Sequence, residues 1–321
     1  MRARLLILAA AVVLLGTGAF AYIRWAAARP AAAPPAAAGT VSLTPGPRLL
    51  TVTDRHLAAV PSENPGGDRS VSTVECVRAY ASGGTGICLR QNTPWSYQVV
   101  VLDAALHDRR ALDIPGLPNR ARVSPSGRMV AWTTFVGGDS YTSAGFSTRT
   151  GILDTISGTT VTTLEDFAIT RDGHPYQAVD VNFWGVTFTP DDNAFYATMS
   201  TSGHRYLIRG DFAARTVTTL RDNVECPSLS PDGQRLAFKQ AIGGDPLQGW
   251  RLSVLDLATM TVTATAEPQS VDDQAAWLDD ASLAYTLRRP DGQPDVWTVP
   301  ADGTGSSRLL IPGAESPSPL S

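Results

Sequence analysis

The fold is decided by the stretch Leu229-Ser230-Pro231-Asp232-Gly233-Gln234-Arg235-Leu236-Ala237-Phe238, which reads as a tight turn between two apolar strands. Serine suits the first position of a type I turn, proline presets φ at the second, and glycine suits the fourth. Apolar residues alternate with polar ones on both sides, as half-buried strands require. The pattern recurs at Val123–Trp132 and Phe188–Tyr196, and looser copies without the Ser-Pro pair lie at Ala79–Cys88 and Trp277–Tyr285.

A second repeated element is a hairpin with an apolar first strand, a polar corner and a Thr/Val-rich second strand. Its six copies reach their corners at Pro61, Asp103, Asp154, Asp211, Asp256 and Pro300. These corners are 42, 51, 57, 45 and 44 residues apart. A repeat of this length is typical of one four-stranded propeller blade.

Six hairpins but only five turn elements indicate a circular closure. We therefore predict an all-β fold, a six-bladed β-propeller of four-stranded antiparallel blades, closed by N- and C-terminal strands that share the last blade. The inner strand of that blade would come from the segment near Glu315–Leu320. A two-sheet sandwich is the alternative, but a sandwich does not need matching copies of a turn and a hairpin.

One turn and the strand that follows it carry a family resemblance. The turn Ser230–Phe238, followed by the strand Val254-Leu255-Asp256-Leu257, resembles the WD40-like (PD40) repeats of TolB-like β-propellers. The resemblance covers residues 45–321 and implies an exported six-bladed propeller that serves as a binding platform in the cell envelope. The chain departs from TolB in that an Ala/Pro-rich stretch, and no obvious α/β domain, precedes the blades.

The N-terminal residues 1–23 predict export. Two arginines in Met1–Arg4 precede the uncharged run Leu5–Ile23, and Ala19-Phe20-Ala21 matches the cleavage pattern of a signal peptide. The same run is long enough to be an uncleaved membrane anchor. Both alternatives place the propeller outside the cytoplasmic membrane, either secreted or held by a single N-terminal helix. Residues 24–44 then form an Ala/Pro-rich linker, and residues 45–321 form the propeller.

Charge and motifs exclude two classes of function. Residues 1–39 hold four arginines and no acid, so the remainder carries 22 basic and 30 acidic side chains, a net charge of about −8. Such a body does not suit nucleic acid binding. A serine hydrolase is excluded because no G-x-S-x-G motif occurs. The histidines are isolated from one another in sequence, and they are His56, His107, His174 and His204.

The three cysteines differ in their expected states. Cys76 and Cys88 lie six residues on either side of Ser82, which predicts that they face each other on neighbouring strands. A disulfide is then possible in an exported protein, and two buried free thiols are the alternative. Cys226 is expected to be a free, buried thiol. The spacing predicts no metal site.

A candidate ligand face follows from the residues that precede each inner strand. These positions hold mostly carboxylates, and they are Glu75, Arg120, Asp180, Asn182, Glu225, Asp272, Asp273 and Glu315. The two longest insertions, Phe135–Arg149 and Asp166–Trp184, are expected on the same face and carry aromatic residues, among them Tyr141 and Trp184. The alternative is that these are solvated loop carboxylates and ordinary loop packing.

Two functions remain compatible with this face. The first is a non-enzymatic binding or scaffold module at the cell envelope, whose partner is a protein, a peptide or a glycan. The second is a propeller lyase or hydrolase acting on an extracellular polymer, with Asp180 and Asp272 as acid and base. No catalytic motif and no cofactor are predicted. Arg120 and Arg122 would neutralise only part of the acidic ring; Ca²⁺ or the positive end of a peptide partner would offset the rest, and screening by water alone is the alternative.

Overall fold

The computed structural model describes residues 15–18, 40–137 and 147–320. The chain divides into two compact units, Met1–Ala36 and Ala37–Ser321. In the first unit residues 15–18 are helical, and the rest of the predicted signal peptide or anchor lies outside the described residues. Across the residues described, no helix has the length and the apolar character needed to cross a membrane.

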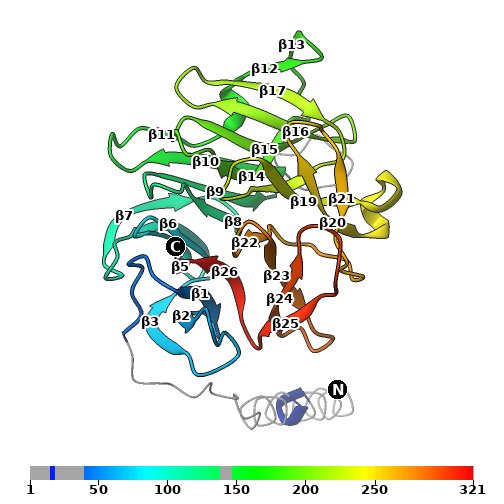
Figure 1. Cartoon of the computed structure of the whole chain (residues 1–321). Helices are drawn as coiled ribbons and strands as arrows, with labels where there is room; N and C mark the ends of the chain where they lie inside the picture. The colour runs from blue at the N-terminus through cyan, green and yellow to red at the C-terminus, as the bar shows by residue number, and fades with distance from the viewer. Residues whose placement is uncertain (1–14, 19–39, 138–146, 321) are drawn as a thin grey trace, which may run out of the picture. The chain divides into compact units, whose positions relative to one another are not determined.

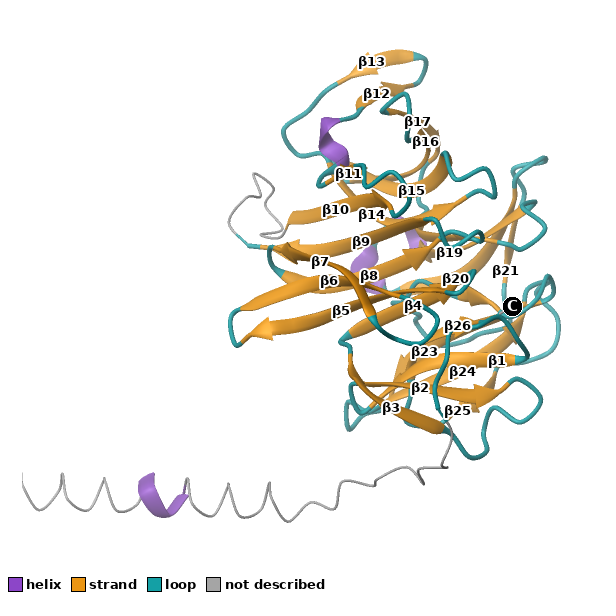
Figure 2. Cartoon of the chain, turned by 90° about the vertical axis from the view of Figure 1, so that its left-hand side faces the viewer, coloured by secondary structure: helices purple, strands orange, loops and turns teal. Residues whose placement is uncertain are grey.

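The unit Ala37–Ser321 is a ring of six β-sheets (Figures 1 and 2). The first two blades are β4 (Arg78–Ser82), β5 (Thr85–Thr93), β6 (Ser96–Leu102) and β7 (Asp108–Ile114), then β8 (Leu117–Val123), β9 (Met129–Val136), β10 (Ser147–Asp154) and β11 (Thr160–Val161). The third contains β14 (Asn182–Phe188), β15 (Ala194–Thr201), β16 (His204–Asp211) and β17 (Thr216–Arg221). The fourth contains β18 (Glu225–Leu229), β19 (Arg235–Ala241), β20 (Trp250–Asp256) and β21 (Val262–Ala264). The fifth contains β22 (Ala276–Trp277), β23 (Ser282–Arg288), β24 (Pro294–Pro300) and β25 (Arg308–Ile311).

The sixth blade closes the ring with strands from both ends of the propeller, in the order β26 (Glu315–Pro319), β1 (Arg48–Thr53), β2 (His56–Pro61) and β3 (Ser70–Glu75). Leu50 of β1 pairs with Ser318 of β26. The Ser318 hydroxyl also accepts from the Ala81 amide at 3.0 Å and donates to its carbonyl at 2.6 Å, which ties β26 to the first blade. The predicted six-bladed fold and its shared last blade are confirmed.

The inner strands of the six blades define the central channel. Each of them contacts the next around the ring, in the order β4, β8, β14, β18, β22, β26 and back to β4. The apolar core lies between neighbouring sheets, where Phe183, Phe195 and Met199 are fully buried together. Propellers protect their sheet edges by this radial repetition.

The repeated turns adopt the conformation that their residues predict. The Ser230 carbonyl accepts from the Gly233 amide at 2.9 Å, and the Ser230 hydroxyl accepts from the Arg235 amide at 3.0 Å. Ser124 makes the equivalent two bonds in the second blade. Gly233 has a φ of 71°, which explains why glycine is favoured at the fourth position.

The insertion Asp166–Trp184 differs from the prediction of a loop on the ligand face. It follows the short 3₁₀ helix η1 (Leu164–Asp166) and forms a hairpin of β12 (Ala168–Arg171) and β13 (His174–Tyr176). Strand β12 pairs in parallel with β17, so the third blade has six strands and is not purely antiparallel. The hairpin thus covers β17 at the outer edge of this blade. An uncovered edge strand would expose unpaired backbone groups.

The structure contains a disulfide between Cys76 and Cys88. The predicted strand register was wrong, however, because Cys88 of β5 pairs with Ala79, and Cys76 lies in the connection before β4. The turn is centred between Gly83 and Gly84, both with positive φ, rather than on Ser82. The bond therefore fastens the connection between two blades onto the first blade.

Candidate functional site

The channel mouth is a cavity of about 580 Å³ on the side where the inner strands begin. Five blades contribute the residues that line it, which are Arg78, Asn119, Arg120, Phe135, Trp184, Arg205, Glu225, Cys226, Lys239, Pro246, Leu247, Trp250 and Asp272. The Ser-Pro turns lie where the inner strands end, around a smaller cavity of about 200 Å³. The two ends of the channel therefore differ in both size and chemistry.

Glu225 is a buried carboxylate of the channel mouth with three partners. It is 4% exposed, and its Oε1 atom forms an ion pair with Arg205 Nε at 3.1 Å and accepts a hydrogen bond from Trp250 Nε1 at 3.0 Å. Its Oε2 atom lies 3.6 Å from Lys239 Nζ, on the residue directly opposite in β19. A buried carboxylate needs such partners because desolvation strongly disfavours an isolated charge.

Asp272 joins two cations across the mouth. Its Oδ1 atom lies 2.5 Å from Lys239 Nζ and 3.4 Å from an Arg120 terminal nitrogen. Burial tends to raise the pKa of Asp272, but the two cations outweigh it and the pKa is lowered. Arg120 is itself buried, and its Nε atom donates to Cys226 Sγ at 3.4 Å. Cys226 is the predicted free, buried thiol.

Asp273 is buried beside the mouth. It accepts from Arg78 at 3.3 Å and from the Thr286 amide at 3.0 Å. Burial opposes ionisation of Asp273, yet Arg78 and Arg120 hold its pKa below the usual value. Asp273 therefore serves to anchor the arginines rather than to face a ligand.

The prediction that carboxylates outnumber cations at the channel mouth was wrong. Three cations that the sequence analysis did not consider, Arg78, Arg205 and Lys239, join Arg120 there. Arg122 points elsewhere, since it donates to the Ala275 carbonyl and lies over the Tyr80 ring. Glu225, Asp272 and Asp273 thus meet four cations, so the described residues of the mouth show no surplus of negative charge.

This balance predicts the response of the protein to Ca²⁺. Millimolar Ca²⁺ is expected to shift the midpoint of thermal unfolding no more than NaCl of equal ionic strength, because the carboxylate oxygens already bind cations of the chain. The measurement is thermal unfolding with Ca²⁺, with NaCl and with EDTA. A rise specific to Ca²⁺ that disappears in Asp272→Asn would contradict this charge assignment.

Apolar side chains form the rim above these charges. Leu247, on the short 3₁₀ helix η3 (Pro246–Gln248), is 96% exposed, and Phe135 at the end of β9 is 39% exposed. Trp250 lies over Lys239, whose Nζ is 4.0 Å from the ring centroid. Ile242 of η2 (Ile242–Gly244), in the same β19–β20 connection, is also exposed. Clustered exposed apolar residues mark interaction sites more often than isolated ones do.

Four of the other predicted residues do not line the mouth. Glu75 is largely exposed and lies 3.8 Å from His56, while Glu315 pairs with Arg288 at 2.8 Å. Asp180 and Asn182 line a different cavity. Tyr141 lies outside the described residues.

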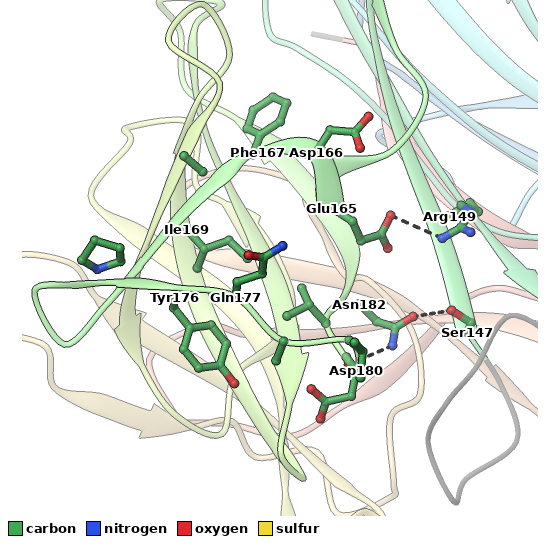
Figure 3. Close-up of a pocket in the computed structure, with 15 residues that line it drawn as sticks. Ser147, Arg149, Glu165, Asp166, Phe167, Ile169, Tyr176, Gln177, Asp180 and Asn182 are labelled. Carbon is green, nitrogen blue, oxygen red and sulfur yellow. Dashed lines mark hydrogen bonds and ion pairs between the residues drawn. The ribbon is translucent and has the colours of Figure 1, made fainter.

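That second cavity, the lateral cavity, lies between the second and third blades and has a volume of about 820 Å³ (Figure 3). It is lined by Ser147, Arg149, Glu165, Asp166, Phe167, Ala168, Ile169 and residues 175–182. Asp180 accepts from the Thr201 hydroxyl and the Ser202 amide, and the latter bond is the main cause of its lowered pKa. Asn182 accepts from the Ser147 hydroxyl at 2.7 Å.

The proposed catalytic pair Asp180 and Asp272 is not brought together. The two residues line different cavities, and the pKa of each is lowered. An acid–base pair must reach one substrate, and its acid must retain a proton near neutral pH. This pair meets neither requirement.

The residues missed by sequence reasoning include Arg78 on the inner strand β4 and several residues on the second and third strands of the blades. Lys239 and Trp250 reach the mouth from β19 and β20, and Leu247 reaches it from the connection between them. One signal was present in the sequence, since Lys239 is the only lysine of the chain.

Comparison with known proteins supports the fold. No protein-family model matches the chain. A segment of 83 residues is 32% identical to a protein TolB homolog of Chlorobium luteolum, and it spans 26% of this chain but only 18% of that protein.

Two solved structures share the architecture. TolB from Acinetobacter baumannii superposes with a TM-score of 0.63 at 17% identity, over 86% of this chain and 67% of that one. A chain of the nidogen/laminin complex superposes with a TM-score of 0.57 at 13% identity, over 85% of this chain and 98% of that one. At such identities the likeness concerns the fold alone.

Proposed function

We propose that this chain, a TolB-like six-bladed β-propeller, is an exported, non-enzymatic binding module of the cell envelope whose channel mouth receives a protein or peptide partner. The observation that carries the proposal is the composition of that mouth. Exposed apolar residues, Leu247 and Phe135, surround a floor of paired charges in a cavity of about 580 Å³. Interfaces combine an apolar contact area with oriented polar groups in this way.

Two features of the chain support export. The uncharged run Leu5–Ile23 follows two arginines, as in a signal peptide or an N-terminal anchor. The disulfide between Cys76 and Cys88 suits an oxidising compartment, because cytosolic thiols are kept reduced. The TolB-like fold is consistent with an envelope location. Fractionation of host cells, with protease added to intact spheroplasts, tests the side of the membrane on which the propeller lies.

Leu247→Asp tests the binding face. The side chain is almost fully exposed, so the charge should leave stability unchanged while it opposes burial against an apolar partner surface. Loss of a buried leucine contact is worth about 1.5–3 kcal/mol, which corresponds to a loss of affinity of about tenfold or more. The measurement is quantitative capture of envelope proteins by the tagged full-length chain in its native host.

Ile156→Asp is the matched control. Ile156 is 78% exposed, but it lies in the β10–β11 connection, on the side where the inner strands end. A partner of the channel mouth is lost with Leu247→Asp and retained with Ile156→Asp. If both variants retain every partner, or if both lose the same one, the channel mouth is not the binding face.

A further inference from the structure

The lateral cavity is separate from the channel mouth and has the size of a ligand site. Its volume of about 820 Å³ lies within the range of about 300–1,000 Å³ that is usual for small-molecule pockets. Three elements enclose it: β10 on one side, η1 and the β12–β13 hairpin on another, and the segment leading into β14 (Figure 3). Because the hairpin is an addition to the third blade, the cavity exists only through this insertion.

Glu165 on η1 is the carboxylate of this cavity with unused hydrogen-bonding capacity. Its side chain is 21% exposed, and its Oε2 atom lies 3.5 Å from an Arg149 terminal nitrogen, at the limit of an interaction. Its buried Oε1 atom has no hydrogen-bond partner among the described residues. A buried oxygen in this state leaves the full cost of desolvation uncompensated. Burial accordingly raises the pKa of Glu165 to about 7.

Two other polar residues of the cavity, Asp180 and Asn182, are already engaged. Both carboxylate oxygens of Asp180 accept hydrogen bonds, from Thr201 and Ser202. The Asn182 amide oxygen accepts from Ser147. Glu165 therefore has more unmet hydrogen-bonding capacity than Asp180 or Asn182.

The walls of the cavity define the rest of the ligand. Ile169, Ala178 and the 83% exposed Val179 provide apolar surface. Three carboxylates line the cavity together with one cation, Arg149. An anionic ligand would meet this surplus of negative charge, whereas a cationic head with an aliphatic stem suits both the charge and the walls.

We propose that the lateral cavity binds an alkylammonium group, whose nitrogen donates to the Glu165 carboxylate while its methylene stem packs on Ile169 and Val179. An ammonium carries three donors, and its charge compensates a partly buried carboxylate that Arg149 meets only at 3.5 Å. The group belongs either to a free aliphatic amine or to a lysine side chain of a partner protein. The proposal does not depend on the channel mouth.

The test uses matched pairs of probes on the full-length protein at pH 8. Pentylammonium and 1-pentanol compare a cation with a neutral molecule of similar shape. The peptide acetyl-Gly-Lys-Gly-amide and its Nε-acetyllysine form make the same comparison for a lysine side chain. Binding is measured by calorimetry or by the chemical shifts of the protein.

Each cation is expected to bind more tightly than its neutral counterpart, and Glu165→Gln should weaken it about tenfold, the effect of one charge-assisted hydrogen bond. Glu63→Gln, at an exposed glutamate of the sixth blade, should change nothing. Binding of pentylammonium identifies a free amine as the ligand, and binding of the peptide alone identifies a lysine side chain. The proposal is overturned if neither cation binds, if the neutral probes bind equally well, or if Glu165→Gln binds like the unmodified chain.

A second measurement does not depend on the folding of any variant. Lowering the pH from 8 to 5.5 protonates Glu165, so the unmodified protein should lose about tenfold in affinity. The other charged groups that line the cavity are Arg149 on β10, Asp166 on η1 and Asp180 before β14. The pKa of Asp180 is lowered, so this carboxylate stays ionised between pH 5.5 and 8. Affinity that is independent of pH would contradict the role of Glu165.

Discussion

Glu225→Gln is expected to lower the free energy of unfolding by about 3–5 kcal/mol, the usual cost of removing one partner from a buried ion pair. The carboxylate contacts Arg205, Lys239 and Trp250, and both it and Lys239 are about 5% exposed. Glutamine has the same shape and keeps an oxygen for Trp250. The loss therefore reports the charge of Arg205 without its carboxylate, and of Lys239 with Asp272 as its one remaining carboxylate, rather than a cavity.

A double-mutant cycle separates this charge effect from other causes. Lys239→Met removes a cation that loses its contact with a carboxylate in Glu225→Gln. The double variant Glu225→Gln, Lys239→Met should therefore be more stable than the sum of the two single changes predicts. Denaturant unfolding of the four proteins gives the coupling energy, and Glu63→Gln serves as the exposed control. Strict additivity of the two changes would show that Glu225 and Lys239 do not act as a pair.

Loss of the Cys76–Cys88 disulfide is expected to destabilise the propeller by about 3 kcal/mol. The bond joins residues 12 apart, and the chain-entropy relation for a loop of this length gives a value of that size. The double variant Cys76→Ala, Cys88→Ala removes the bond together with two buried sulfurs. Reduction of the unmodified protein removes the bond alone.

Comparison of the two treatments isolates the cross-link. Thermal unfolding with and without a reductant should differ for the unmodified protein and coincide for the double variant. The remaining thiol, Cys226, is free in both proteins and so does not distinguish them. If the reductant leaves the midpoint of the unmodified protein unchanged, the bond contributes nothing to its stability.

The parts of the fold that follow from local chemistry were predictable. Ser230 and Gly233 each have a role within the same turn, so a short pattern suffices to find the blades. The shared last blade followed from counting hairpins against turns, and β26 lies where this count placed it. Strand β12, with four residues and a parallel partner, has no comparable signal in the sequence.

The candidate site was less predictable, because its residues meet through strand register and radial position. The pairing of Glu225 with Lys239 depends on a bulged register between β18 and β19 that no turn residue specifies. Asp180 and Asp272 both precede inner strands, yet they line different cavities because Asp180 lies beside the β12–β13 insertion. Alignment of equivalent positions thus found Arg120, Glu225 and Asp272, which line one cavity, but it did not show which of the other side chains lie elsewhere.

The sixth blade has a consequence for the order in which the protein is made. Its outer three strands are synthesised first and its inner strand, Glu315–Pro319, is synthesised last. Until Glu315–Pro319 emerge, the inner edge of β1 lacks its strand partner β26 and the ring stays open. If the chain is exported N-terminus first, as proposed above, an unpaired strand must stay soluble throughout the passage across the membrane. Proteins that hold nascent chains should thus bind this protein at Arg48–Thr53 for longer than at any later strand.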